Sequence, residues 1–546
     1  MKALLAAVAT GVTIALAFPS TGWFPLALVA WAPILVLARS WGTKRRFWMG
    51  WIVGFTTNVI CFRWIDFTLD VMTNLPDWSH PVGLILFAAW HGLLAAIFLA
   101  LAEPIRLAAE RARAGSGAMM VAASFAALEW AFPFLFPWGY GQALWKVSAF
   151  TSVMALTGVA GLTFVAMAFN TLIADLWISR RRQALLWAAA ILVPLLLFGG
   201  IWSLAINATG DGRTLRVAIL QPNHTLEDKQ IIASGSAKAR GVRRRLLSSF
   251  LAQVEELESG EHDLVVAPEG AYPFLWILDP NKNDPYQRAN TWATRRVVMA
   301  VAKGPAADTI IGGLRLPGGD QRLRNSAVHF GPGGEILGLY DKQVLVPFGE
   351  YMPGRDMFPS LAESVRGISN FGSGDTPCRF EVAGEVASCG ICYETLFEDA
   401  TRQDLGDASL LLNLSIDTWF GEGVAAEFHL MSQAGRAAEL GVPLLRAALT
   451  GISGVVGPDG VLGERLDVGV RGILKTEVTI PTIQTPYRMM GPLFRWIFVG
   501  LTLWALVDIW RARRRRKREE QKVAAEAAEP ALEATEAEPD TPAEHL

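Results

Sequence analysis

ALLWAAAILVPLLLFGGIWSLAI (184–206) is followed, after a short polar connection, by LRVAIL (215–220). The first run is apolar throughout and has the length that a helix needs to cross a bilayer, roughly 20 residues. A helix suits that environment because it pairs its own backbone hydrogen-bonding groups. The second run is short and β-branched, which is typical of a strand in a water-soluble domain. The chain is therefore expected to leave a membrane-embedded part and enter a soluble domain between these two runs.

The composition agrees with a protein of two such parts. Of the 546 residues, 52% are hydrophobic and 18% are charged, against a typical charged share of about 25%. The shortage of charge is confined to residues 1–206 and 490–510. A net charge of −2 gives no general attraction for nucleic acid. The four cysteines are too few for a disulfide scaffold, and no HExxH motif or His/Cys cluster suggests a metal. We therefore expect neither a metal nor a cofactor.

Eight apolar stretches are predicted to span the membrane: 3–18, 24–38, 47–67, 82–102, 118–136, 150–178, 184–206 and 492–510. Basic residues gather after the second, fourth, sixth and eighth of them, and basic connections face the cytoplasm. The alternate connections have no Lys or Arg apart from Lys146. The soluble domain is therefore predicted to lie outside the cytoplasm. The basic clusters are Arg39, Lys44, Arg45 and Arg46; Arg106, Arg111 and Arg113; Arg180, Arg181 and Arg182; and RARRRRKR from Arg511.

The soluble region alternates short strands with helices, which predicts an α/β domain with sheets covered by helices. Helices are expected near 236–258, 291–303 and 424–440. Strands are expected at 215–220, 263–268, 309–314, 326–330, 335–340, 409–415 and 451–457. The predicted division is a seven-helix bundle (1–207), a catalytic domain (213–485), an eighth helix (490–511) and a tail (512–546). The tail is basic and then acidic, and we expect it to be disordered because it has little to bury.

Three polar residues stand where predicted strands end: Glu269, Lys342 and Cys392. Each alone has an ordinary structural explanation, as a turn carboxylate, a solvated charge or a packed thiol. Together they have a chemical logic. An ammonium stabilises a thiolate, a carboxylate accepts the thiol proton, and the ammonium then stabilises an oxyanion. These three groups suffice for acyl transfer through a thioester.

With these residues in view, the chain resembles the apolipoprotein N-acyltransferases of bacterial envelopes, which are membrane members of the nitrilase superfamily. In the membrane part, ALEWAFPFLFPWGYGQ (127–142) is similar to the stretch before the family's sixth helix. The matching stretches of the soluble part are VVAPEGAYP (265–273), YDKQVLVPFGEYMP (340–353), CGICYETLF (389–397), NLSIDTWFG (413–421) and HLMSQAGRAAELGVPLLRA (429–447).

The resemblance implies eight transmembrane helices and an extracytoplasmic nitrilase-like αββα sandwich. It implies that Glu269 is the general base, Lys342 the oxyanion stabiliser and Cys392 the nucleophile. The residues that it places in or around the pocket are Glu350, Tyr393, Glu394 and Trp419.

The resemblance also implies a two-step reaction. Cys392 takes an acyl chain from a phospholipid and passes it to the α-amine of a diacylglyceryl-cysteine at the N-terminus of an apolipoprotein. The expected setting is the bacterial inner membrane, with a multi-pass chain, a periplasmic catalytic domain and a cytoplasmic tail. We expect a monomer.

Four residues depart from the family's pattern: Pro222, Gln230, Ile416 and Leu449. None belongs to the three candidate catalytic positions, so they bear on the substrate-facing loops and on the acyl acceptor. The N-terminus also allows a second interpretation, because Lys2, an apolar run and Ala15-Leu16-Ala17 fit a cleavable signal peptide. The family resemblance favours a retained first helix, and cleavage would leave the orientation of every later span unchanged.

The cysteines raise two further possibilities. Cys389 and Cys392 form a C-x-x-C pair, but residues three apart in a strand face opposite ways, which argues against a redox bond between them. RFEV-AG-EVAS reads as a hairpin turning at Ala383-Gly384, which would bring Cys378 opposite Cys389. These two are either a disulfide or two packed thiols.

Two other functions were weighed against acyl transfer to a lipoprotein. A membrane-anchored amidase of the nitrilase type would use the same three residues with water as acceptor. A transporter or scaffold with a degenerate outer domain is disfavoured by the intact Glu269, Lys342 and Cys392 and by the scarcity of charge within the spans.

Overall fold

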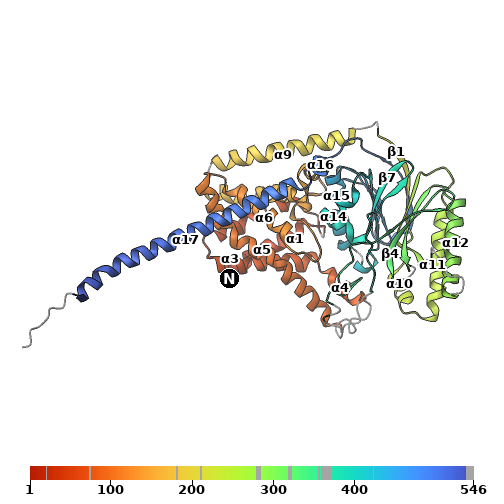
Figure 1. The fold of residues 1–546 in the computed structure, drawn as a ribbon, viewed down its shortest axis with the longest axis horizontal. Helices are drawn as coiled ribbons and strands as arrows, with labels where there is room; N and C mark the ends of the chain where they lie inside the picture. The colour runs from red at the N-terminus through yellow and green to blue at the C-terminus, as the bar shows by residue number, and fades with distance from the viewer. Residues whose placement is uncertain are drawn as a thin grey trace, which may run out of the picture.

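The computed structural model describes residues 1–19, 21–72, 76–179, 182–208, 212–277, 285–317, 322–354, 357, 370–421 and 423–536. A bundle of helices occupies one part of the molecule, and two sheets with their covering helices occupy the other (Figure 1). The last long helix returns from the sheets to the bundle and extends beyond it (Figure 1). The predicted combination of a helical membrane part with an α/β domain is confirmed.

The membrane part is built from helices that match the predicted apolar stretches. They are α1 (Lys2–Ala17), η1 (Phe24–Leu28), α2 (Ala32–Ala38), α3 (Thr43–Cys61), α4 (Trp64–Met72), α5 (Ser79–Ala112), α6 (Gly117–Ala131), η2 (Tyr140–Leu144), α7 (Ser148–Thr151), α8 (Met154–Ser179), α9 (Arg182–Ala208) and α17 (Leu493–Glu536).

By length and composition, four of the described helices can cross a membrane: α5, α8, α9 and α17. The pair α3 and α4 also passes when counted together and is bent by 56°, so the predicted span 47–67 corresponds to a broken helix. Three shorter apolar helices lie at Lys2–Ala17, Phe24–Ala38 and Gly117–Ala131. Several apolar helices are thus present, while the number of eight spans stays a prediction.

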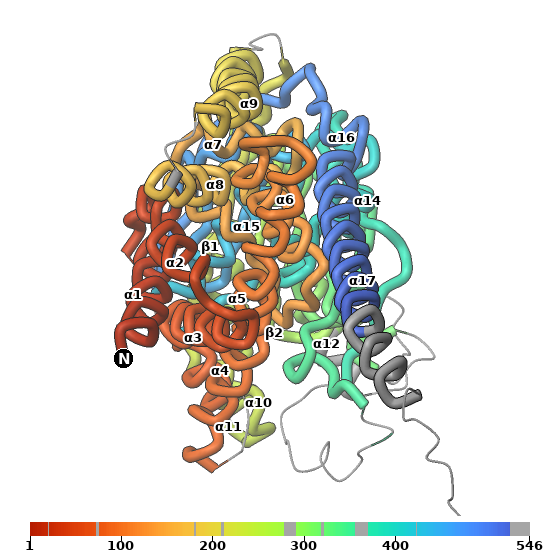
Figure 2. Tube along the Cα trace, turned by 90° about the vertical axis from the view of Figure 1, so that its left-hand side faces the viewer, coloured from red at the N-terminus to blue at the C-terminus, as the bar shows by residue number. Residues whose placement is uncertain are grey.

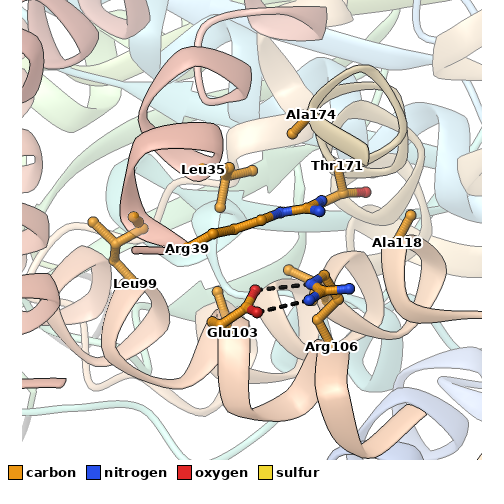
Figure 3. Close-up of a pocket in the computed structure, with 11 residues that line it drawn as sticks. Leu35, Arg39, Leu99, Glu103, Arg106, Ala118, Thr171 and Ala174 are labelled. Atoms are coloured by element: carbon orange, nitrogen blue, oxygen red, sulfur yellow. Dashed lines mark hydrogen bonds and ion pairs between the residues drawn. The ribbon is translucent and has the colours of Figure 1, made fainter. Parts of the chain in front are cut away.

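Two ion pairs lie at the end of the bundle that is predicted to be cytoplasmic, one between helices and one within a helix. Arg39 at the end of α2 lies 2.8 Å from Asp175 of α8. Glu103 and Arg106 of α5 pair at 2.7 Å, and Figure 3 shows this pair below the extended side chain of Arg39. Buried charges at membrane depth need such partners. Arg180 and Arg181 of the third basic cluster lie outside the described residues.

In the tail, α17 continues as a helix through Glu536, and the expected disorder of residues 512–546 stays a prediction. The segment beyond residue 511 is rich in Arg, Lys, Glu and Ala, which are good helix formers. Arg516 and Glu520 add an ion pair one turn apart, at 3.0 Å. The acidic end at 537–546 lies outside the described residues.

The soluble part contains two six-stranded sheets. Their orders are β12-β1-β2-β3-β4-β5 and β11-β10-β9-β8-β7-β6, each with a parallel centre and antiparallel edges. The strands are β1 (Thr214–Gln221), β2 (Leu264–Trp276), β3 (Asp308–Arg315), β4 (Arg324–Phe330), β5 (Ile336–Asp341), β6 (Phe380–Val382), β7 (Glu385–Ile391), β8 (Leu410–Ser415), β9 (Leu444–Ala448), β10 (Ser453–Val456), β11 (Leu462–Leu466) and β12 (Gly472–Thr479).

Helices cover the outer face of each sheet, which gives four layers. The helices of this part are α10 (Leu226–Ala233), α11 (Ala237–Glu255), α12 (Pro285–Lys303), η3 (Cys392–Leu396), α14 (Glu398–Leu405), η4 (Thr418–Phe420), α15 (Val424–Leu440) and α16 (Pro486–Met490). The sides of β1 show why the sheets stack: Val217 and Ile219 belong to the core shared with the second sheet, whereas Ala218 and Leu220 pack with α11 and α12. The predicted αββα arrangement is therefore present.

The second sheet faces the bundle through α14 and α15, while α11 and α12 lie on the far side (Figure 1). Phe428 of α15 stacks on Phe18 at 5.6 Å between ring centres. Glu439 at the other end of α15 accepts a 2.7 Å hydrogen bond from the Val159 amide of α8. The sheet ends that carry the candidate residues are therefore held against the membrane part.

Candidate active site

Cys392 stands where β7 ends and η3 begins. Its side chain is buried, and its φ of 54° is a left-handed value that non-glycine residues rarely adopt. Its carbonyl oxygen accepts a 3.2 Å hydrogen bond from Asn413 Nδ2 and lies 3.1 Å from His429 Nε2. Strained backbone persists where the surroundings hold it, and it is common at reactive residues.

Lys342 follows β5, and its ammonium group is buried with only 1% of the side chain exposed. Nζ donates a 2.8 Å hydrogen bond to Glu350 Oε1. Glu350 Oε2 accepts from the Val346 amide at 2.8 Å, which fixes the carboxylate over the loop. Glu350 therefore holds the ammonium in place and balances its charge.

Glu269 lies within β2 and is also buried. Its Oε1 accepts a 2.7 Å hydrogen bond from Asn325 Nδ2, while Oε2 has no hydrogen-bond partner among the described residues. Gly312 on the neighbouring β3 permits this placement, because a Cβ there would come within 2.6 Å of the Glu269 Cα. One oxygen of Glu269 is thus anchored and the other is open to accept a proton.

The three candidate catalytic residues are close enough that their charges shift one another's pKa. Burial raises the pKa of the Cys392 thiol to about 12; the charge of Glu269 adds to this and Lys342 opposes it. Burial raises the pKa of Glu269 to about 7, against the opposing charge of Lys342. The thiol is therefore protonated at neutral pH, and a carboxylate that titrates there is beside it.

The same carboxylates keep Lys342 charged. Burial alone lowers the pKa of its ammonium, but the negative charges of Glu350 and Glu269 outweigh that effect and raise the pKa above its ordinary value. A charged ammonium in a water-poor pocket can stabilise both a thiolate and an oxyanion.

Glu394 accepts hydrogen bonds from several parts of the pocket. Its two oxygens accept hydrogen bonds from the Tyr340 hydroxyl, at 2.9 and 3.0 Å, and from three backbone amides, those of Gln343, Val344 and Ile391, at 2.6–2.9 Å. These partners come from the loop after Lys342 and from the strand before Cys392. Glu394 therefore fixes the ammonium and the sulfur relative to each other.

Tyr393 and Trp419 connect the pocket to the membrane part. The Tyr393 hydroxyl donates a 2.5 Å hydrogen bond to the Leu135 carbonyl, in the loop after α6. The Trp419 carbonyl accepts a 3.0 Å hydrogen bond from Thr68 of α4. Both residues thus lie at the border between the catalytic domain and the bundle.

Two neighbours of Glu269 carry no motif of their own and were not predicted. Asn325 of β4 also approaches Glu350 Oε1, at 3.3 Å, and so bridges the two carboxylates. Lys229 of α10 lies with its Nζ 2.9 Å from the position of a Cβ on Gly270, and its charge lowers the pKa of Glu269. The sequence alone offers no signal for Asn325, because its contact with Glu269 reaches across β3 of the folded sheet.

The four departures from the family pattern differ in their surroundings. Ile416 Cδ1 is 3.4 Å from the Cβ position of Gly270, next to Glu269. Leu449 is fully buried, and its carbonyl accepts a hydrogen bond from Asn223 at 2.9 Å. Pro222 is buried and Gln230 is exposed. Of the four, Ile416 is the one beside a candidate catalytic residue.

Cys378 and Cys389 face each other across the β6–β7 hairpin, which turns at Ala383-Gly384 as predicted. Both are free, buried thiols, and burial together with the neighbouring Cys389 raises the pKa of Cys378. As for metals, Asp70, Asp77 and His80 bring ligand atoms within 4.8 Å of one another. The two aspartates are exposed at the junction of α4 and α5, a common arrangement on surfaces.

Comparison with known proteins identifies the families of both parts of the chain. Residues 216–487 match the carbon-nitrogen hydrolase family, and residues 10–172 match the apolipoprotein N-acyltransferase N-terminal domain. An apolipoprotein N-acyltransferase of Caulobacter vibrioides is 31% identical over 512 residues, covering 89% of this chain and 90% of its own. One of Geobacter metallireducens is 27% identical over 509 residues, covering 91% and 93%.

Among solved structures, Nit3 of Saccharomyces cerevisiae, a member of branch 10 of the nitrilase superfamily, is 15% identical and covers 52% of this chain and 95% of its own, with a TM-score of 0.36.

A four-layer α/β domain with a buried Cys, Glu and Lys, joined to apolar helices, defines a membrane-bound protein of the carbon-nitrogen hydrolase class. The named relatives match both the helical part and the α/β part of the chain, so the family can be stated more narrowly. The chain belongs to the apolipoprotein N-acyltransferase family.

Proposed function

We propose that this acyltransferase moves a fatty acyl chain from a phospholipid to the N-terminal cysteine of a diacylated apolipoprotein, by way of a thioester on Cys392. The N-acyltransferase activity follows from family membership. The observation that supports the covalent route is the shared burial of Cys392, Glu269 and Lys342 beside the membrane part.

In the first step, Glu269 accepts the proton of the Cys392 thiol, and the sulfur attacks the carbonyl carbon of a phospholipid ester. The carbonyl oxygen becomes an oxyanion, which the Lys342 ammonium stabilises. As the tetrahedral intermediate collapses, the ester C–O bond breaks and Glu269 returns its proton to the leaving alkoxide. The products are the acyl-enzyme and a lysophospholipid.

In the second step, the neutral α-amine of the apolipoprotein attacks the thioester carbonyl. Glu269 takes a proton from the amine, Lys342 again faces the oxyanion, and the C–S bond breaks as the amide forms. The thiolate then regains a proton from Glu269. A water-poor pocket protects the thioester from hydrolysis between the two steps.

The remaining predicted site residues have supporting roles in this proposal. Glu350 holds Lys342 through their 2.8 Å contact, and Glu394 fixes the loop and the strand that present the ammonium and the sulfur. Tyr393 and Trp419, at the border with the bundle, line the path by which lipid chains reach the pocket.

The proposed topology has eight spans: seven in residues 1–207 and one in 490–511, with the catalytic domain at 213–485. The apolar helices and the position of the basic clusters support it. The protein would lie in the bacterial inner membrane as a monomer, with its catalytic domain in the periplasm and its C-terminal tail in the cytoplasm.

The test is transfer between two purified substrates. Wild-type protein, phospholipid vesicles and a diacylated lipopeptide should give N-acylated lipopeptide, measured by mass spectrometry. Cys392→Ala should lower the product at least about 10³-fold, while Cys389→Ala, which removes a buried thiol three residues earlier, should leave it near wild type. Release of free fatty acid from the phospholipid without lipopeptide product would instead indicate a nitrilase-type hydrolase with water as acceptor.

A further inference from the structure

A groove of about 560 Å³ lies in the membrane part, with α9 on one side and α17 on the other. Between them α6 and α8 contribute buried residues, and the last turn of α5 lies at one end. Figure 2 shows α17 running beside α6, with α9 at the top of the view. Every residue that lines the groove belongs to the membrane part. The groove is therefore separate from the pocket of Cys392 in the catalytic domain.

The walls of the groove are apolar over a length that suits part of a lipid chain. On α17 the lining residues run from Phe494 to Trp504, which is about 15 Å along the helix axis. The hydrocarbon core of a bilayer is about 30 Å thick, so this length is about that of one leaflet. The core of a bilayer holds no water that could fill such a groove. An acyl chain is therefore the group available to occupy it.

Three polar residues line the groove: Arg113, Ser116 and Thr157. The Ser116 hydroxyl donates a 3.0 Å hydrogen bond to the Ala109 carbonyl. The Thr157 hydroxyl donates a 2.9 Å hydrogen bond to the Val153 carbonyl. Both hydroxyls are thus satisfied by the backbone of neighbouring turns. Arg113 is the lining residue whose polar group is left for a ligand.

Arg113 is an exposed residue at the end of α5, where the groove opens. Its guanidinium stacks on Trp187 of α9 at 4.7 Å. Within the described part of the chain its side chain forms no hydrogen bond and no ion pair. Trp at the ends of membrane helices marks the depth of lipid head groups. A guanidinium at that depth, with its N–H groups unused, is suited to a lipid phosphate.

The carboxylates next to Arg113 are already engaged, and further cations follow. Glu110 accepts hydrogen bonds from two backbone amides of the turn between α5 and α6, at 3.0 and 3.1 Å. Asp508 of α17 pairs with Arg111 at 2.7 Å, which brings the basic run from Arg511 close to this end of the groove. Clustered Lys and Arg at the end of a membrane helix attract anionic lipids. The charge at the opening therefore favours a negative ligand.

We propose that this groove binds an anionic phospholipid such as phosphatidylglycerol, with one acyl chain between α9 and α17 and the phosphate on Arg113. The lipid is a structural ligand and not a substrate, because its site lies at the end of the bundle that the basic clusters predict to be cytoplasmic. It fills the space between α9 and α17, and a ligand that binds only the folded protein stabilises it.

The test locates the lipid by photo-crosslinking in Cys392→Ala protein, which lacks the proposed nucleophile. The full chain is reconstituted in phosphatidylcholine vesicles with a small share of phosphatidylglycerol that carries a diazirine in the middle of one acyl chain. Mass spectrometry of peptides should find adducts on residues 109–123, 187–195 and 494–504. A phosphatidylethanolamine probe with the same chains should label these peptides at least about fivefold less.

Two groove variants and one matched control make the result specific. Arg113→Gln removes the phosphate ligand, and Ala112→Phe narrows the groove from an exposed position without changing charge. Each should lower phosphatidylglycerol labelling at least about fivefold. Arg45→Gln is the control, because Arg45 is also an exposed arginine stacked on a tryptophan, at 4.9 Å, but lies outside the groove. It should be labelled like the parent. Ala112→Phe keeps the test valid if Arg113→Gln does not fold.

Three results would overturn the assignment. One is a set of adducts spread evenly over the lipid-facing helices, as expected of bulk lipid. The second is equal labelling of the groove peptides by the phosphatidylglycerol and phosphatidylethanolamine probes. The third is labelling in both groove variants at the level of Arg45→Gln. Adducts confined to the groove peptides, selective for phosphatidylglycerol and lost in Arg113→Gln or Ala112→Phe, would support the site.

Discussion

Two buried glutamates of one pocket, Glu394 and Glu269, differ in how many hydrogen-bond donors surround their carboxylate oxygens. Glu394 accepts hydrogen bonds from four donors, the Tyr340 hydroxyl and three backbone amides, with both oxygens engaged. Glu269 receives one, from Asn325, and its second oxygen has no partner among the described residues. Burial raises the pKa of both carboxyl groups.

This difference in hydrogen bonding suits the two carboxylates to different roles, one in positioning other groups and one in proton transfer. A carboxylate whose lone pairs are all occupied can position other groups, but accepting a proton would break the contacts that hold it. A carboxylate with one anchored and one open oxygen keeps its orientation while it takes and returns a proton. We therefore propose that Glu394 positions the pocket and that Glu269 is the base.

The largest expected effect is that of Glu269→Gln, which keeps the shape and removes the proton acceptor. Acyl-enzyme formation should fall about 10²–10⁴-fold, the usual contribution of general-base catalysis. Thermal stability should remain close to wild type, because only one hydrogen bond is involved. Rapid-quench mass analysis and a melting curve measure the two quantities. An acylation rate within threefold of wild type would show that Glu269 is not the general base.

The pH dependence should follow Glu269. Burial raises its pKa to about 7, and only the ionised carboxylate accepts a proton, so the rate should fall as pH drops below about 7. The decline should approach tenfold per pH unit, or about 10²-fold two units below. A rate profile of single-turnover acylation checks this, with Glu269→Gln as the control that should lose the slope. A flat profile from pH 5 to 8 in wild type contradicts the assignment.

Glu394→Gln should act first on stability. Its amide group faces backbone N–H donors, so at least one buried donor loses its acceptor, at a cost of about 1–3 kcal/mol. The melting temperature should therefore fall clearly below that of Glu269→Gln. Any activity that remains in the folded fraction should keep the wild-type pH profile, because the base is still present. A stable variant without activity would reverse the roles of the two glutamates.

Asn325→Ala should have the smallest effect. Its amide lowers the pKa of Glu269 by donating to Oε1, so its loss should move the acid limb of the profile to higher pH. At neutral pH we expect a rate reduction of about tenfold or less, since the base is still present but less ionised. A shift of the limb to lower pH would mean that Asn325 does not act through Glu269.

The candidate catalytic residues could be proposed from the sequence because each follows a predicted strand, and strand ends of such domains meet at one edge. The structure places Glu269 within the longer strand β2 rather than at its end. Asn325 was not predictable in this way, since it lies within β4 and reaches Glu269 across β3 through the fold alone. The strained φ of Cys392 is likewise a property of the packed structure, held by contacts to its carbonyl from Asn413 and His429.

Several elements were not predicted from the sequence, and each has a physical reason. β9, β11 and β12 were not predicted: β9 lies in a motif read with the preceding helix, and β11 and β12 are polar strands at the edges of the sheets. The 56° bend between α3 and α4 interrupts an apolar run that contains no Pro or Gly at the break. The helix beyond residue 511 follows from local propensity, which composition alone does not distinguish from disorder.

The most direct test of the central claim is the mass of the intact protein after incubation with phospholipid alone. Wild-type protein and Cys389→Ala should each gain one acyl chain, located on the peptide that contains residue 392 and removed by hydroxylamine, as expected of a thioester. Cys392→Ala should gain none. An adduct that persists in Cys392→Ala, or a wild-type protein that transfers chains to lipopeptide without ever carrying one, would contradict the account.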